Sequence, residues 1–197
     1  MSSTHETTTT TVTELATSCV DFVQRSVGIE LDYTQDTLPV LDHYLREARK
    51  HAQREAVLAP LVATAGAYFG VLTTRQFPGA YLHVADSYER MRVQFSTIFL
   101  HFNPFGIAQE VIHQADAPGW NAHFATLPDQ HRVVEQSVDH GLQLRDEDYY
   151  SFSVRYEMLD QIVAVLQAIE EQRRDSPRTF GHAVYAAAVG EGVNAKS

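Results

Sequence analysis

The chain has 197 residues, of which 44% are hydrophobic, so it is long enough and apolar enough to bury the core of one globular domain. Its 25 acidic and 15 basic residues give a formal net charge of −10, and lysine occurs only twice. Because nucleic acids and anionic membranes are bound by clustered Lys and Arg, this composition argues against both as partners.

The chain begins with a threonine-rich stretch, followed by a first predicted helix. Residues 1–12 are expected to form a disordered tail, and they lack the basic region and apolar run of a secretory signal. A helix is predicted from Glu14 to about Ser26, with Thr13 as its cap. Cys19 lies on the apolar stripe of this helix, which favours a small core residue over a thiolate. A single cysteine excludes an intrachain disulfide and fits a cytoplasmic protein.

The next segment predicts a short strand and then an amphipathic helix. Residues 29–33 alternate between apolar and polar side chains, as a strand does. Asp36 or Thr37 is expected to cap the helix that follows. Asp42 and Arg46 are four residues apart, which favours an ion pair on the solvent side of that helix.

Residues 56–74 carry no charge, which raises the question of a membrane span, because about 20 apolar residues can cross a bilayer. Threonines, glycines and Pro60 lower the hydrophobicity of the segment, so the sequence favours a buried helix that starts near Ala59. Gly66 and Gly70 belong to a strip of small residues on one side of this helix. Since glycine in a helix costs about 1 kcal/mol relative to alanine, we expect close packing against another backbone to compensate.

Two antiparallel strands are predicted next, at Ala80–Val84 and Arg90–Phe102. The second strand is apolar on both faces in its second half, which is typical of a central strand. Its alternation places these residues on one face: Val93, Phe95, Phe99 and His101.

The remainder of the chain predicts three helices, a short strand and a tail. Asn103 is a suitable cap, and Pro104 a suitable first residue, for a helix that ends near Ala115. The later elements are a short strand at Trp120–Phe124, helices at 129–140 and 154–173, and a flexible tail at 175–197 that contains a short helix. Residues 13–174 are therefore expected to be one domain. Because strands and helices are partly segregated, we predict an α+β fold with a small, mostly antiparallel sheet of three to four strands covered by several helices.

Five side chains are candidates for a metal site: His101, Glu110, His113, His131 and Glu135. Glu110 and His113 have the E-x-x-H spacing of di-iron bundles, but the chain contains no second such motif. His131 and Glu135 lie one helical turn apart, where the carboxylate could orient the imidazole. A solvated helix face explains both spacings without a metal and is the favoured interpretation. His101 ends the predicted central strand, where sheets often place functional groups; the alternative is a buried, hydrogen-bonded imidazole.

Charged and aromatic residues gather just before the last long helix. Residues 146–150 are three acids followed by two tyrosines. Acids near the start of a helix are favoured by its dipole, whereas tyrosine and arginine are enriched at the hot spots of protein interfaces. The candidate partner-binding residues are therefore Tyr149, Tyr150, Arg155 and Tyr156, and helix capping with aromatic packing explains the same cluster equally well.

At two motifs the chain resembles small bacterial proteins of uncharacterised function. The motifs are LDYTQDTLPVLDHYL at residues 31–45 and AGAYFG at residues 65–70. The resemblance covers the first half of the chain and implies a small α+β fold. It implies no activity, cofactor or catalytic residue.

The sequence as a whole favours a soluble, cytoplasmic accessory or regulatory protein over an enzyme. Such a protein acts through protein–protein contact, as an adaptor, a regulator or an immunity-type inhibitor. The chain contains no G-x-S-x-G, P-loop, G-x-G-x-x-G or H-E-x-x-H motif, and no cofactor is expected. The alternative is a metal-dependent enzyme or a small-ligand-binding protein with a histidine/carboxylate site, which requires three of the five candidates to converge in one pocket.

Overall fold

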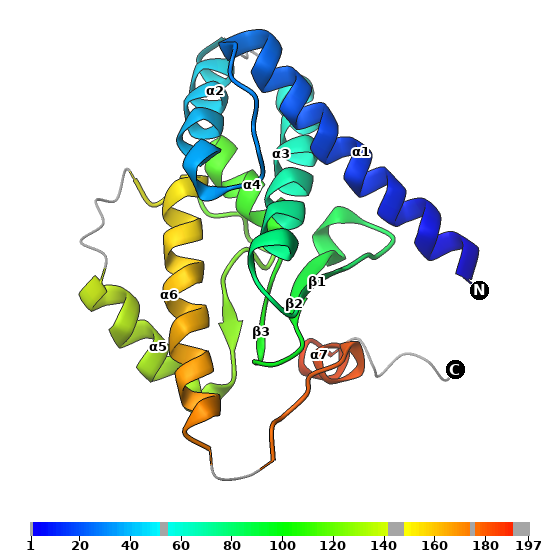
Figure 1. The fold of residues 1–197 in the computed structure, drawn as a ribbon. Coiled ribbons are helices and arrows are strands. Elements are labelled where there is room, and N and C mark those ends of the chain that lie inside the picture. The colour runs from blue at the N-terminus through cyan, green and yellow to red at the C-terminus, as the bar shows by residue number, and fades with distance from the viewer. Residues whose placement is uncertain (1, 52–54, 142–147, 174–175, 191–197) are drawn as a thin grey trace.

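The computed structural model describes residues 2–51, 55–141, 148–173 and 176–190. It shows a four-stranded antiparallel sheet, in the order β1-β2-β3-β4, with helices packed around it (Figure 1). The strands are β1 (Ala80–His83), β2 (Arg92–Phe95), β3 (Leu100–Phe102) and β4 (Ala125–Thr126). The α-helices are α1 (Ser2–Val27), α2 (Leu38–His51), α3 (Glu55–Gln76), α4 (Pro104–His113), α5 (Pro128–Gly141), α6 (Phe152–Glu171) and α7 (His182–Ala188). This arrangement confirms the predicted α+β fold.

Helix α3 lies at the centre of the helical layer. It contacts α1 and α4, and it lies against β1 and β2 of the sheet (Figure 1). Phe69 of α3 packs on Phe102 of β3 and on Phe152 of α6, with ring centroids 6.0 and 5.0 Å apart, so one aromatic ring joins the sheet to two helices. This helix is the uncharged segment of the sequence. Among the described residues, no helix has the length and hydropathy that a membrane crossing requires.

The predicted close approach of α3 to another backbone occurs at Gly66. A Cβ atom at this position would lie 2.8 Å from the Cα atom of Phe105 and 2.8 Å from its Cδ1 atom. Gly70, one turn later, is less tight, because a Cβ atom there would meet Pro104 Cγ at 3.2 Å. Gly66 therefore sets the distance between α3 and α4.

We expect Gly66→Ala to lower the free energy of unfolding by about 1–2 kcal/mol, since overpacking costs roughly 1–3 kcal/mol and exceeds the gain in helix propensity. Urea denaturation followed by circular dichroism measures the change. Gly70→Ala is the matched control and should lose less. A Gly66→Ala variant more stable than wild type would show that the spacing of α3 and α4 is free to adjust.

The strand predicted over residues 90–102 is interrupted by a hairpin at residues 96–99. Its two halves are β2 and β3, which pair with Val93 opposite Phe102 and Gln94 opposite His101. Because directly opposed residues share a face, Val93 and His101 lie on different faces of the sheet. The predicted shared face is therefore wrong.

Tyr185 of α7 holds this hairpin in place. Its hydroxyl donates to the carbonyl oxygen of Phe95 at 2.6 Å and accepts hydrogen bonds from the amides of Phe95 and Leu100, each at 3.3 Å. The ring is buried, and burial raises the pKa of the Tyr185 phenol to about 12. The short helix expected in the tail therefore lies at residues 182–188, and it is docked against the sheet rather than loosely held.

The structure also differs from the sequence expectations near the N-terminus. Helix α1 begins at Ser2 rather than Glu14, so it includes most of the threonine-rich stretch. Its buried residue Val12 lies within the hydrophobic core, to which the packing of α1 on α3 contributes. The strand predicted at residues 29–33 is absent. These residues pair with none of the four strands, and the segment ends at Tyr33, whose φ of 61° is not extended.

Candidate functional site

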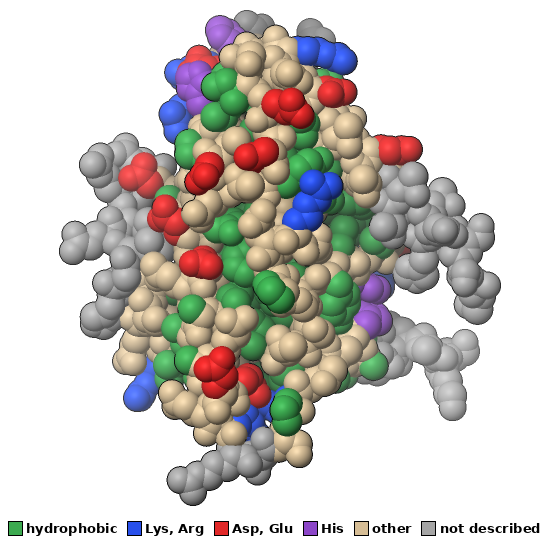
Figure 2. Space-filling view, in the orientation of Figure 1, with side chains coloured by type: hydrophobic (Ala, Val, Ile, Leu, Met, Phe, Trp, Pro, Cys, Tyr) green, Lys and Arg blue, Asp and Glu red, His purple; other side chains and the backbone are tan. Residues whose placement is uncertain are grey.

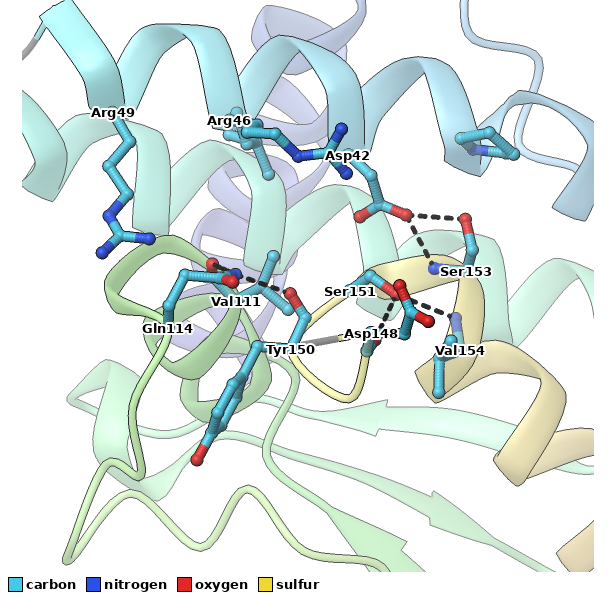
Figure 3. Close-up of a pocket in the computed structure, with 12 residues that line it drawn as sticks. Asp42, Arg46, Arg49, Val111, Gln114, Asp148, Tyr150, Ser151, Ser153 and Val154 are labelled. Atoms are coloured by element: carbon cyan, nitrogen blue, oxygen red, sulfur yellow. Dashed lines mark hydrogen bonds between the residues drawn. The ribbon is translucent and has the colours of Figure 1, made fainter. Parts of the chain in front are cut away.

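A hollow of about 680 Å³ lies between α2, α4 and the start of α6 (Figure 3). Leu45 and Val111 contribute apolar side chains to its lining, and α2 also supplies Asp42, Arg46 and Arg49. The hollow is therefore mixed in character, with an apolar part beside charged groups. Its chemistry depends on which of these polar groups the fold already uses.

The Asp42 carboxylate is hydrogen-bonded within the fold. It is 8% exposed, and its carboxylate accepts hydrogen bonds from the amides of Phe152 at 2.7 Å and Ser153 at 3.0 Å, and from the Ser153 hydroxyl at 2.6 Å. These amides belong to the first turn of α6, so Asp42 caps that helix from the neighbouring helix. Burial raises the pKa of Asp42, although the bonds from Ser153 and Phe152 act in the opposite direction. The predicted Asp42–Arg46 ion pair is absent, because both carboxylate oxygens are directed to α6.

Other polar groups around the hollow are also hydrogen-bonded. The Gln114 side-chain amide donates to the carbonyl oxygens of Val111 at 2.7 Å and Tyr150 at 2.8 Å. The Ser151 hydroxyl caps α6 by accepting from the amide of Val154 at 3.3 Å. These bonds join α4 to the loop before α6 and fix the shape of the hollow.

Arg46 and Arg49 have no such role. Both are exposed, and neither makes a hydrogen bond or ion pair with any residue in the described ranges. In Figure 3 the Arg49 side chain extends from α2 toward Gln114, while Arg46 extends toward Asp42. Acidic side chains are spread over the face shown in Figure 2, and the lining of the hollow itself holds two arginines, Arg46 and Arg49, beside two acids, Asp42 and Asp148.

The candidate partner-binding residues divide into two groups. Tyr149 and Tyr150 are half-buried, and Tyr150 lines the hollow. Arg155 and Tyr156 are only 1% and 7% exposed, so neither is available to a partner at the surface. Their burial follows from the position of α6, which presents both side chains inward from its first turns.

Arg155 forms a buried ion pair with Glu110 of α4. Its guanidinium also lies 4.0 Å from the ring centroid of Tyr149, which is a cation–π contact. The second Glu110 oxygen accepts from the amide of Ala117 at 3.3 Å. Glu110 and Arg155 therefore join α4 to α6, and the Glu110 carboxylate is committed to that contact.

The five candidate metal ligands are not brought together. Glu110 is paired with Arg155, and His131 and Glu135 are exposed on α5. His113 lies at the C-terminal end of α4, and His101 lies on β3. Within the described ranges, no group of three or more His, Cys, Asp or Glu residues is placed to hold a metal ion.

His101 and Cys19 are both buried and both resist ionisation. Burial raises the pKa of the Cys19 thiol to about 12, which rules out a thiolate nucleophile near neutral pH. Burial also lowers the pKa of His101 to about 4, with further lowering by Arg92 and His123. Near neutral pH the His101 imidazole is therefore uncharged.

Comparison of the chain with known protein families, with curated proteins and with solved structures gives no match. No residue role is therefore transferred from a relative, and function rests on the chemistry of the molecule itself. Sequence reasoning missed Arg46 and Arg49 because it assigned them to the solvent side of a helix. Their spacing of three residues on one helix face was the available signal.

Proposed function

We propose that this protein is an accessory or regulatory protein that acts by binding another protein, and that the hollow beside α2 receives an acidic side chain of that partner. The observation that carries the proposal is the pair Arg46 and Arg49. They are exposed and three residues apart on one helix, and neither forms a hydrogen bond or ion pair among the described residues, although the charge of Arg46 acts on Asp42. The other polar groups named above are already bonded within the fold.

The chemistry of arginine favours a carboxylate as the group that is recognised. A guanidinium presents parallel N–H donors that match the two oxygens of a carboxylate, and such charge-assisted bonds are stronger than neutral ones. Leu45 and Val111 offer apolar surface beside the charges, and Tyr150 supplies an aromatic ring of the kind enriched at interface hot spots. An acidic residue next to an aliphatic residue in a partner segment would match both parts of the hollow.

Selection of phage-displayed random peptides on the full chain tests this proposal. We expect the enriched peptides to carry Asp or Glu beside an aliphatic residue. Arg46→Glu combined with Arg49→Glu should weaken their binding by about 10- to 100-fold, since hydrogen bonds to charged groups contribute roughly 1.5–3 kcal/mol. Isothermal titration calorimetry with a synthetic copy of an enriched peptide gives the affinity.

Arg25→Glu combined with Arg132→Glu is the matched control, because it makes the same change of charge at exposed arginines on α1 and α5. This control should keep the affinity within about twofold. Peptides that show no acidic preference, or that bind the α2 variant as tightly as wild type, would contradict the proposal. Failure to enrich any peptide would count against it as well.

A further inference from the structure

A second set of polar side chains lies on the sheet face opposite α3. Tyr81, Gln94 and His101 are direct neighbours across β1, β2 and β3, so their side chains form one row on this face. Helix α7 lies against the row, because the Tyr185 ring meets the His101 ring edge-on at a centroid distance of 5.4 Å. The opposite face, with Phe102, packs on α3.

Two members of this row are buried and Tyr81 is half-buried, yet one buried polar atom of each side chain has no hydrogen-bond partner among the described residues. Gln94 is 2% exposed and His101 is 6% exposed. The Tyr81 hydroxyl, Gln94 Oε1 and His101 Nδ1 are each buried without a hydrogen-bond partner among the described residues. Native proteins rarely leave such groups unpaired, because an unsatisfied buried group forfeits its bonds to water. Three such groups in adjacent positions indicate that a molecule outside the described chain forms their missing hydrogen bonds.

The charged side chain next to the row is a cation. It is Arg92, which follows the same face of β2 and acts on His101. Arg92 is 6% exposed and donates to the carbonyl oxygens of Glu89 and Met91, so its guanidinium is held at the edge of the row. This local field contrasts with the net charge of −10 of the whole chain.

We infer that the row Tyr81–Gln94–His101, with Arg92 at its edge, binds a small oxyanion, the carboxylate or phosphate group of a ligand, beneath α7. All four side chains can donate a hydrogen bond to oxygen: the phenol, the Gln94 amide nitrogen after a half-turn of the side chain, the neutral imidazole and the guanidinium. The row ends at β1, the edge strand, where Tyr81 is half-buried. This site is separate from the hollow beside α2 and does not depend on the function proposed for it.

Side-chain NMR of the labelled full chain tests the inference, with sodium acetate and inorganic phosphate as probes at constant ionic strength. We expect saturable shifts of the Gln94 amide and His101 imidazole signals with at least one probe, at a Kd below about 10 mM. A response to acetate alone identifies a carboxylate ligand, and a response to phosphate alone identifies a phosphate ligand. Acetamide, the neutral isostere of acetate, should produce no saturable shift.

Tyr81→Phe and Gln94→Leu should each weaken binding of the active probe by about tenfold. Without the probe, Tyr81→Phe should leave the urea midpoint unchanged or raised, because it removes a hydroxyl that has no partner. Tyr44→Phe, at a half-buried tyrosine on α2, is the matched control and should leave probe binding unchanged. Absence of a saturable shift, equal binding of acetamide, or unchanged affinity in both variants would overturn the inference and leave ordered water as the partner of the row.

Discussion

Replacing Arg155 with methionine is expected to lower the free energy of unfolding by about 3–5 kcal/mol, which makes it one of the most damaging single changes in this molecule. The side chain is 1% exposed and is paired with Glu110 between α4 and α6. Methionine fills much of the same space but leaves the Glu110 carboxylate buried without a cation. It also removes the cation from the Tyr149 ring. Urea denaturation, followed by far-UV circular dichroism, measures the loss.

A double variant separates loss of the ion pair from loss of packing. Glu110→Leu with Arg155→Met removes both charges, and well-packed apolar replacements of a buried pair are often neutral or stabilising. We therefore expect the double variant to recover most of the stability lost by Arg155→Met. Arg132→Met, at an exposed arginine on α5, should stay within about 0.5 kcal/mol of wild type. A double variant as unstable as the sum of the two single variants would show that packing, not charge, is responsible.

The elements that the sequence predicts correctly are those whose signals are local. Asn103 caps α4 through its side-chain oxygen, which accepts from the amides of Phe105 and Gly106, as expected from an Asn-Pro pair before an apolar run. The long helix α6 was equally predictable from its periodic apolar stripe. In both cases the residues that decide the structure lie within the element or directly beside it.

The elements that were missed depend on residues far away in the chain. Residues 96–99 were predicted as part of a strand because Ile98 and Phe99 continue the apolar pattern. The hairpin that they form is instead bonded at its flanking amides by the Tyr185 hydroxyl, which lies 85 to 90 residues later in the chain. The role of Asp42 was missed for the same reason, since its partners at the start of α6 lie 110 residues away. The local spacing predicts an ion pair between Asp42 and Arg46. With Arg46 expected to be paired, the two arginines on α2 were not recognised as a candidate site.

His101 makes the stability of the fold sensitive to acid. Burial, Arg92 and His123 hold its pKa at about 4, below the ordinary value of 6.5. Its other neighbours are aromatic: Phe99, and Tyr185 from α7. Between pH 6.5 and 4 the unfolded chain binds a proton that the folded chain does not. Stability from this group is therefore fully present above about pH 6.5 and is lost as pH falls to about 4.

We expect this single group to account for about 3 kcal/mol of the stability lost between pH 7 and pH 4, at 1.36 kcal/mol for each unit of the shift. In His101→Phe the group is absent, so its urea midpoint should fall less steeply over that range than that of wild type. His131→Phe, at an exposed histidine on α5, is the matched control and should keep the wild-type dependence. Parallel pH profiles for wild type and His101→Phe would refute the acid sensitivity of this residue.

An oxyanion bound in the row would favour protonated His101, so saturating acetate or phosphate should flatten the wild-type profile and leave that of His101→Phe unchanged.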